Sequence, residues 1–485
     1  MNGNFAPIHD ELTITKLPII SGEIPKDLNG IYARIGPNPQ FNPLYNLHWF
    51  EGDGHIHALE FKDGNCSYRN RFVQTEKYLQ EKENGRPLAH SMIMDGGINP
   101  LLKYTYHYLY ERMYRGLNGP LKKGGGAANT NIIYHGGKFL ALEEGHKPME
   151  VTFPDLKTVG EFDFKGKLKH NFTAHPKIDP RNGEMIFFGY ELNPRGTSFR
   201  YGVTDKNLDI IHSHEFTKEE TPYVCMIHDM VITENYSIVG FYPLILDVKK
   251  VLTGENPIVF DDTKPTKIAV FPRLYDGKSS KIQFFEAETG VAFHYINAYE
   301  EREGDDLLIK ILVHVQKSFS MTDFSKGQPF PYEYTLNLTS GKLISEGFLK
   351  TLDGNQLPSG EFPVVRGEIT GQKNRFFYYS LVVEKSELFV ANSIAKVDLE
   401  KGNAFQTITI PNNGMIGEVS IIPRSEEEDD VYIVCYAYHE HSNSSTVFVF
   451  DGKTMNNTPL VNIELPRRVP FGFHGNFFET QKLLK

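Results

Sequence analysis

Short runs rich in Ile, Val, Phe and Tyr recur along the whole chain, each roughly four to eight residues long, the usual length of a strand. Examples are GEMIFFGY at 183–190, VYIVCYAY at 431–438 and STVFVFD at 445–451. Turn signals separate these runs, for instance KDG at 62–64 and RNG at 181–183. Because β-branched and aromatic residues favour strands and Gly favours tight turns, the pattern predicts many short strands.

Helical periodicity is scarce, and its best candidates are residues 99–117 and 244–252. Gly and Pro are spread evenly, so no linker divides the chain, and we predict a single all-β domain over residues 1–485. This many strands favour a β-propeller of roughly six to eight four-stranded blades, whose innermost strands surround a common axis. The segments at about 96–123 and 244–252 would form a small helical cap over one face.

Composition narrows the function classes. The net charge of −10 and a pI near 6.0 give no basic footprint, so we expect no nucleic-acid partner. The chain has only three cysteines, far apart, which favours a reducing compartment over a disulfide scaffold. Neither a signal peptide nor a membrane-spanning run is visible. We therefore expect a cytoplasmic protein, with peripheral membrane contact and oligomeric state left open.

Four histidines stand in short apolar or aromatic settings: His175, His228, His294 and His474. Successive members are 53, 66 and 180 residues apart, so one loop or helix cannot hold them together. A propeller axis can, because every blade contributes a strand to it. Neutral imidazole is the commonest metal ligand in proteins, and four of them would form a metal site with coordination positions left open.

Three glutamates lie in comparable apolar β settings: Glu144, Glu361 and Glu418. A buried carboxylate costs several kcal/mol unless it is paired. A metal-bound imidazole commonly donates its other ring N–H to a carboxylate, which fixes its orientation. The glutamates are therefore candidate hydrogen-bond partners of the histidines.

Several long segments together resemble the carotenoid cleavage oxygenases. The segments are 22–41, 48–61, 125–145, 172–190, 361–363, 417–434 and 469–478. The resemblance implies a seven-bladed β-propeller with one Fe(II) per chain on its axis, bound by the four histidines. It also implies that three of the ligands have glutamate partners and that His175 has none. We choose Glu144 over Glu143 for one of these partners, because Glu144 directly precedes Gly145.

The reaction implied by the resemblance is oxidative cleavage of a C=C bond of a carotenoid or apocarotenoid by O₂, giving two carbonyl products. The partners would be a small lipophilic substrate and O₂. No catalytic residue is expected beyond the metal shell. Thr130 is a candidate neighbour of the open iron position, although an ordinary turn or strand threonine is an equal interpretation.

Two other functions stay open. The same site could cleave a stilbenoid or phenylpropanoid, if the cavity supplies polar groups for a phenol. A metal-free propeller acting as a binding scaffold belongs to a different class, and it predicts that some of the seven residues would be lost. For residues 96–117, packing on the propeller and insertion into a membrane surface are both compatible with the mixture of Leu, Tyr, Lys and Arg.

Overall fold

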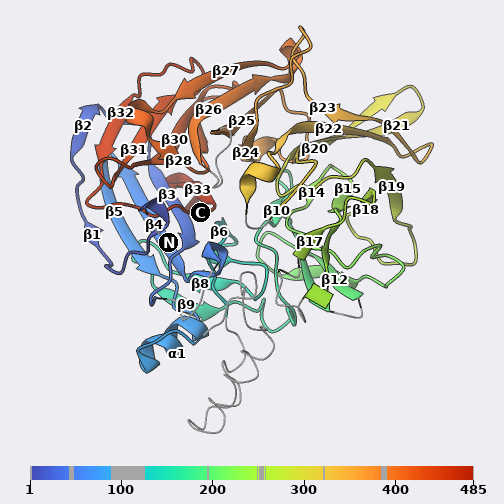
Figure 1. Ribbon diagram of the computed structural model, residues 1–485, viewed down its shortest axis with the longest axis horizontal. Coiled ribbons are helices and arrows are strands. Elements are labelled where there is room, and N and C mark those ends of the chain that lie inside the picture. Colours follow the sequence, from blue (N-terminus) through green and yellow to red (C-terminus); the bar gives the residue numbers. More distant parts are fainter. Residues whose placement is uncertain are drawn as a thin grey trace.

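The computed structural model is built almost entirely from antiparallel β-sheets (Figure 1). It describes residues 3–42, 48–88, 126–193, 196–247, 249–250, 256, 258–320, 323–383 and 390–483. The predicted predominance of β-structure is confirmed: the described residues are mostly β. The proposed cap at 96–123 lies outside the described residues, so the cap and its membrane contact stay predictions.

The sheets follow one another in chain order around the centre of the molecule (Figure 1). The N-terminal sheet has five strands: β1 (Thr13–Ile14), β5 (Asn65–Phe72), β4 (Gly54–Lys62), β3 (Gly30–Pro37) and β33 (Gly475–Glu479). The next sheet contains β6 (Asn131–His135), β7 (Lys138–Leu142), β8 (Met149–Val151) and β9 (Thr158–Glu161). The third contains β10 (Lys177–Ile178), β11 (Met185–Asn193), β12 (Gly196–Thr204) and β13 (Ile210–Glu215).

Two more sheets of four strands complete one side of the molecule. One contains β14 (Val231–Ile232), β15 (Tyr236–Phe241), β18 (Thr266–Pro272) and β19 (Gln283–Ala287). The other contains β20 (Tyr295–Glu303), β21 (Asp306–Val315), β22 (Phe330–Asn337) and β23 (Lys342–Phe348). A separate ribbon pairs β16 (Leu244–Leu246) with β17 (Ile258–Phe260).

The largest sheet has ten strands and includes an N-terminal strand. Its path runs β2 (Ile19–Gly22), β32 (Val461–Glu464), β31 (Ser444–Asp451), β30 (Val431–His439), β28 (Met415–Ile416), β26 (Ala391–Asp398), β25 (Phe376–Val382) and β24 (Gly360–Val364). Off this path, β27 (Ala404–Thr409) pairs with β26 and β29 (Ser420–Pro423) with β30.

Helices are short in the described chain. The α-helices are α1 (Glu76–Asn84) and α4 (Thr480–Leu483). The 3₁₀ turns are η1 (Gly3–Phe5), η2 (Trp49–Glu51), η3 (Phe324–Lys326), η4 (Gly367–Ile369), η5 (Leu399–Lys401) and η6 (Pro411–Asn413). No helix of the described residues is both long and apolar enough to span a bilayer.

The prediction of a helix at 244–252 is wrong for its first residues, because Leu244–Leu246 forms β16 and pairs with Ile258–Phe260. Three apolar residues in a row carry no period that distinguishes a helix from a buried strand, so pairing with a second apolar run decides the outcome. Residues 249–250 are helical, and 251–252 lie outside the described residues.

The predicted turn at 62–64 illustrates how local sequence sets the hairpins. β4 and β5 are joined by Asp63 and Gly64 alone, with φ of 49° and 73°. Both central residues of a type I′ hairpin need this left-handed region, which Gly adopts freely and Asp tolerates. The turn sets the register in which β4 pairs with β5, and both strands belong to the N-terminal sheet.

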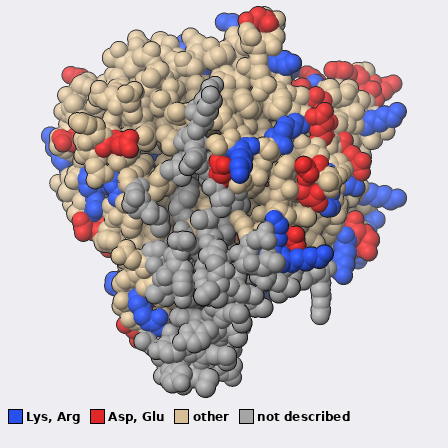
Figure 2. Space-filling view, in the orientation of Figure 1, with Lys and Arg blue, Asp and Glu red and all other residues tan. Residues whose placement is uncertain are grey.

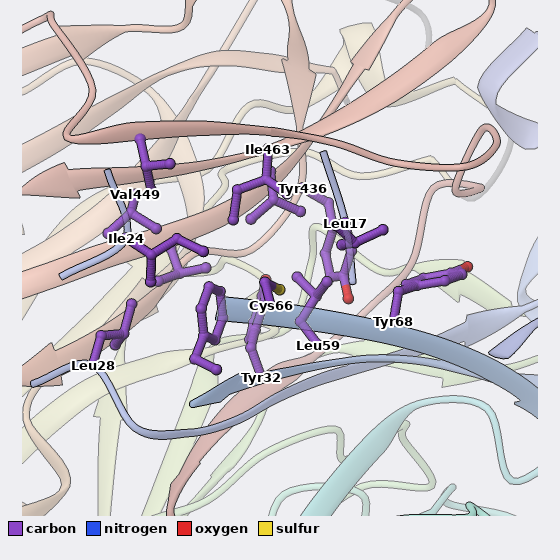
Figure 3. Packing of buried hydrophobic residues seen from close by; sticks show 14 of the residues in the cluster. Leu17, Ile24, Leu28, Tyr32, Leu59, Cys66, Tyr68, Tyr436, Val449 and Ile463 are labelled. Atoms are coloured by element: carbon purple, nitrogen blue, oxygen red, sulfur yellow. The ribbon is translucent and has the colours of Figure 1, made fainter. Parts of the chain in front are cut away.

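Both ends of the chain contribute to one hydrophobic core between the N-terminal and ten-stranded sheets (Figure 3). Tyr32 and Leu59, from β3 and β4, pack against the cluster that includes Tyr436 and Ile463, from β30 and β32. These four side chains are at most 2% exposed. The core therefore anchors β3, the strand that pairs with β33.

Charged side chains are interspersed on the face shown in Figure 2, where acidic and basic groups lie next to one another. Ion pairs on the surface of the sheets include Lys267 with Glu286 and Lys317 with Glu288. Exposed pairs of this kind contribute little to stability. The fold depends on its buried sheet faces instead.

Burial of His55 in β4 predicts acid lability. The side chain is 1% exposed, and its Nε2 lies 2.9 Å from Nδ2 of Asn70. Burial, together with nearby Arg467, lowers the pKa of His55 from 6.5 to about 3. The unfolded chain therefore binds a proton below pH 6.5 that the folded chain does not, and stability is lost as pH falls from 6.5 towards 3.

The amide of His55→Gln can still bond Asn70 but does not titrate. We therefore expect the free energy of unfolding of this variant to fall less steeply with decreasing pH, by about 1.4 kcal/mol for each pH unit. Urea denaturation of both proteins at a series of pH values measures the slope. Equal slopes for the variant and the unsubstituted protein would contradict the assignment.

Candidate metal centre

The four predicted histidines converge on one point, although they come from four different sheets. Their ligand atoms all lie within 4.8 Å of one another. Nε2 of His228 is 3.0 Å from Nε2 of His175 and 3.1 Å from Nε2 of His294. His175 and His474 are buried, and the other two are nearly so.

A common structural position explains the convergence. Each histidine directly precedes, or lies within a few residues of, the start of an edge strand: β10, β14, β20 or β33. The backbone holds these positions: N–H of Ile35 donates to the carbonyl of His474 at 3.0 Å, and N–H of His314 donates to that of His294 at 3.2 Å. The inner edges of four sheets therefore deliver one imidazole each.

The three predicted glutamates contact three of the four imidazoles. Nδ1 of His294 donates to Oε2 of Glu361 at 2.6 Å, and Nδ1 of His474 donates to Oε1 of Glu418 at 2.9 Å. Nδ1 of His228 donates to Oε1 of Glu144. Within the described chain, no ion pair joins His175 to a carboxylate.

The structure separates the roles of the two adjacent glutamates. Glu144 bonds His228, and its other oxygen accepts the hydroxyl of Tyr190 at 2.9 Å. Glu143 instead accepts Nδ1–H of His146 at 2.7 Å. Glu144 is therefore the glutamate whose side chain reaches the histidine cluster.

The electrostatics of the cluster favour neutral imidazoles at two positions. Burial, reinforced by the neighbouring histidines, lowers the pKa of His175 and of His294 well below 6.5. Burial also lowers the pKa of His228, but the charge and hydrogen bond of Glu144 outweigh it and the net pKa is raised. Burial raises the pKa of Glu361.

The arrangement of the ring nitrogens fits a metal ion. When Nδ1–H is donated to a carboxylate, Nε2 of a neutral imidazole presents only a lone pair. A proton can satisfy one facing pair of nitrogens, whereas a metal ion satisfies all four. Nitrogens bound at about 2.1 Å and at right angles would stand about 3.0 Å apart, close to the separations of 3.0 and 3.1 Å around His228.

A cavity of about 310 Å³ borders three of the four histidines: His228, His294 and His474. Most of its wall is apolar or aromatic. The apolar wall residues are Phe50, Met226, Phe293, Pro329, Phe362, Val382, Phe471 and Phe473. Such a wall suits a hydrophobic ligand that reaches the cluster from one side.

Thr130 also lines this cavity. Its hydroxyl donates to Oδ1 of Asn129 at 3.0 Å, and its carbonyl accepts N–H of His474 at 3.2 Å. The structure therefore places Thr130 beside the cluster, and its action on an open coordination position stays a prediction.

Sequence reasoning missed Asp229, which ties three ligand-bearing segments together. This buried carboxylate forms an ion pair with Lys177 at 2.8 Å and accepts N–H of Tyr295 at 3.0 Å. Lys177 lies two residues after His175, Asp229 directly follows His228, and Tyr295 directly follows His294. The sequence did carry a signal for Asp229, because it is an acidic residue inside the mostly apolar stretch MIHDM.

Comparison with known proteins identifies the family. The model of the retinal pigment epithelial membrane protein family matches residues 5–479. The chain is 34% identical to carotenoid 9,10(9',10')-cleavage dioxygenase 1 of Phaseolus vulgaris, over 100% of this chain and 90% of that protein. It is 30% identical to carotenoid cleavage oxygenase 1 of Neurospora crassa, over 98% of this chain and 90% of that protein. The chain belongs to this family, and the predicted resemblance is confirmed.

Solved structures show the same fold. Lignostilbene dioxygenase of Pseudomonas brassicacearum superposes with a TM-score of 0.83 at 24% identity, covering 99% of this chain and 98% of that one. An apocarotenoid oxygenase of Synechocystis superposes with a TM-score of 0.82 at 23% identity, covering 98% of each chain. The mostly β architecture is therefore shared with this group of oxygenases.

We predict that Asp229→Asn weakens metal binding about tenfold, because the ion pair that aligns three histidine segments is lost while one oxygen remains for Tyr295. Anaerobic titration with Co(II) measures the affinity, and the visible spectrum of the bound ion reports its ligand geometry. The exposed Asp305→Asn is the matched control. An unchanged affinity and spectrum in Asp229→Asn, with stability alone reduced, would refute the alignment role.

Proposed function

We propose that this chain is a non-haem Fe(II) dioxygenase that cleaves a C=C bond of a carotenoid or apocarotenoid. The observation that carries the proposal is the convergence of four imidazoles at the wall of an apolar cavity. Carotenoid-cleaving relatives at 34% identity over the whole chain support the substrate class. We also propose that residues 1–485 form a single seven-bladed propeller with one iron per chain, bound by His175, His228, His294 and His474.

The donor set suits this chemistry. Four imidazoles would hold the iron without neutralising its double charge, and Glu144, Glu361 and Glu418 would offset that charge from one hydrogen bond away. Four ligands on a six-coordinate ion leave up to two positions open, and iron(II) with open positions supplies the activation of O₂. Each alkene carbon receives one oxygen atom of O₂, so two carbonyl products account for every atom.

The chain's own residues would position the substrate and exclude water. The aromatic wall, including Phe293 and Phe362, would bury a flat conjugated chain against the histidines. The carboxylates hold three imidazoles in fixed orientations, and the cavity borders His228, His294 and His474, so an iron bound by them would lie beside the substrate. Among the described residues, the arrangement calls for no separate general acid or base.

A stilbenoid substrate remains the second candidate. Polar residues, including Glu143, Gln316 and Gln328, interrupt the apolar wall and could bind a phenol. The metal-free scaffold is disfavoured, because all seven predicted residues are present and the three glutamates bond three of the histidines.

We expect the protein loaded with Fe(II) to convert apocarotenals, under O₂, into shorter aldehydes or ketones detected by chromatography and mass spectrometry. Glu361→Gln should lower kcat/KM about 10- to 100-fold, because the amide releases Nδ1 of His294 from its charged partner. His441→Ala, an exposed histidine outside the cluster, serves as the control and should match the unsubstituted protein. No cleavage of any apocarotenal or stilbene by iron-loaded, folded protein would refute the proposed function.

A further inference from the structure

Glu143 lies in the cavity wall but does not bond the histidine cluster. Four glutamates line the wall: Glu144 and Glu361 bond clustered histidines, Glu143 bonds His146, and Glu51 belongs to η2. Glu143 directly follows β7 and Leu142, and its side chain is 16% exposed. A carboxylate held this far from water needs hydrogen-bond donors to offset its lost hydration.

The local backbone fixes the direction of this carboxylate. Its Oε1 accepts Nδ1–H of His146 at 2.7 Å and N–H of Ala127 at 3.0 Å. Glycine at position 126 makes room for it, because a Cβ there would stand 2.3 Å from Oε1. Two donors on one oxygen thus hold the group in a single orientation.

The other oxygen remains available to a ligand. Among the described residues, no donor bonds Oε2 of Glu143. This oxygen lies 3.7 Å from the position that a Cβ of Gly145 would occupy, and Gly145 is itself a wall residue. Glycine leaves this stretch of wall without a side chain, so Oε2 is open to an occupant of the cavity.

The chemistry of Oε2 restricts that occupant. A carboxylate accepts hydrogen bonds and donates none, so it attracts an O–H group and repels a carbonyl oxygen. A hydrocarbon end at the same place would leave the charge unsolvated and unpaired. The rest of the wall is mostly apolar, which selects a conjugated chain or aromatic ring as the body of the ligand.

We propose that Glu143, oriented by His146, recognises a hydroxyl group on the substrate. The substrate class is therefore a hydroxylated conjugated molecule, with either a ring alcohol on a polyene or a phenol on a stilbene. Glu143 is a specificity residue in this assignment, and a substrate carbonyl would point away from it. The inference rests on the proposed function for the identity of the reaction, but the binding preference does not depend on turnover.

The test compares matched ligands that differ in one hydroxyl: a ring-hydroxylated apocarotenal with its deoxy form, and 4-hydroxystilbene with stilbene. Equilibrium dialysis against the full chain gives Kd for each, and kcat/KM is measured for those that are cleaved. We expect the hydroxylated member of at least one pair to be preferred about 10- to 100-fold, the effect of a hydrogen bond to a charged group. The pair that shows the preference identifies whether the hydroxyl is an alcohol or a phenol.

Glu143→Leu should abolish the preference by raising Kd and KM for the hydroxylated ligand, with little loss for the deoxy form. Glu143→Gln, which keeps the shape and one acceptor oxygen, should retain a smaller preference. Glu219→Gln, an exposed substitution, is the matched control. No preference in the unsubstituted chain, or the same preference in Glu143→Leu, would overturn the inference.

Failure of the two proposals gives different results. A hydroxyl-dependent Kd that disappears in Glu143→Leu, without cleavage of any ligand, would support the recognition role and refute the dioxygenase assignment. Cleavage with no effect of the hydroxyl on Kd or KM would leave the reaction standing and refute the role of Glu143.

Discussion

The geometry of the centre depends on how three carboxylates hold the ring protons of three imidazoles. Glu144, Glu361 and Glu418 accept Nδ1–H of His228, His294 and His474, so Nε2 of each neutral imidazole is left to act as a ligand atom. Nε2 of His228 lies 3.0 Å from Nε2 of His175 and 3.1 Å from Nε2 of His294, and neutral nitrogens this close repel one another unless a proton or a metal ion lies between them. The fold holds the four nitrogens together, and this arrangement fits a metal ion.

The sheets supply the required rigidity. Each of the four histidines stands at or near the start of an edge strand, where the ladder of the sheet fixes the backbone and the side chain points inwards. The hydrophobic core shared by the chain ends anchors β3, and β3 positions β33 and His474. The contacts of Asp229 with Lys177 and Tyr295 then join the segments that carry the other three histidines. Long-range packing and local sequence therefore act on the same few atoms.

Much of this arrangement could be predicted from sequence, because its residues carry local signals. The four histidines stand in apolar runs, the glutamates require partners in such surroundings, and strand-like runs fill the chain between them. The choice of Glu144 over Glu143 followed a short motif, and in the structure Glu144 is the one of the two that bonds a clustered histidine, His228. A three-residue run such as Leu244–Leu246 carries too little periodicity, and there the predicted helix is a strand.

Contacts between distant segments were not predictable in the same way. Asp229 and Lys177 are 52 residues apart, and Tyr190 is 46 residues from Glu144. Hydrophobic periodicity indicates local helices and strands, and it cannot predict either pair, because each forms only when two sheets pack together. The bond between Glu143 and His146 is local, but its place in the cavity wall depends on the packing of the loop at Gly126 and Ala127.

The most direct test of the central claim is the iron content of the protein after anaerobic loading with Fe(II) and removal of excess metal. The four-imidazole centre predicts about one iron per chain in the unsubstituted protein and a sharp loss in His474→Ala. A folded protein that retains no iron, or a His474→Ala variant that retains as much as the unsubstituted chain, would contradict the assignment of the histidine cluster as the metal site.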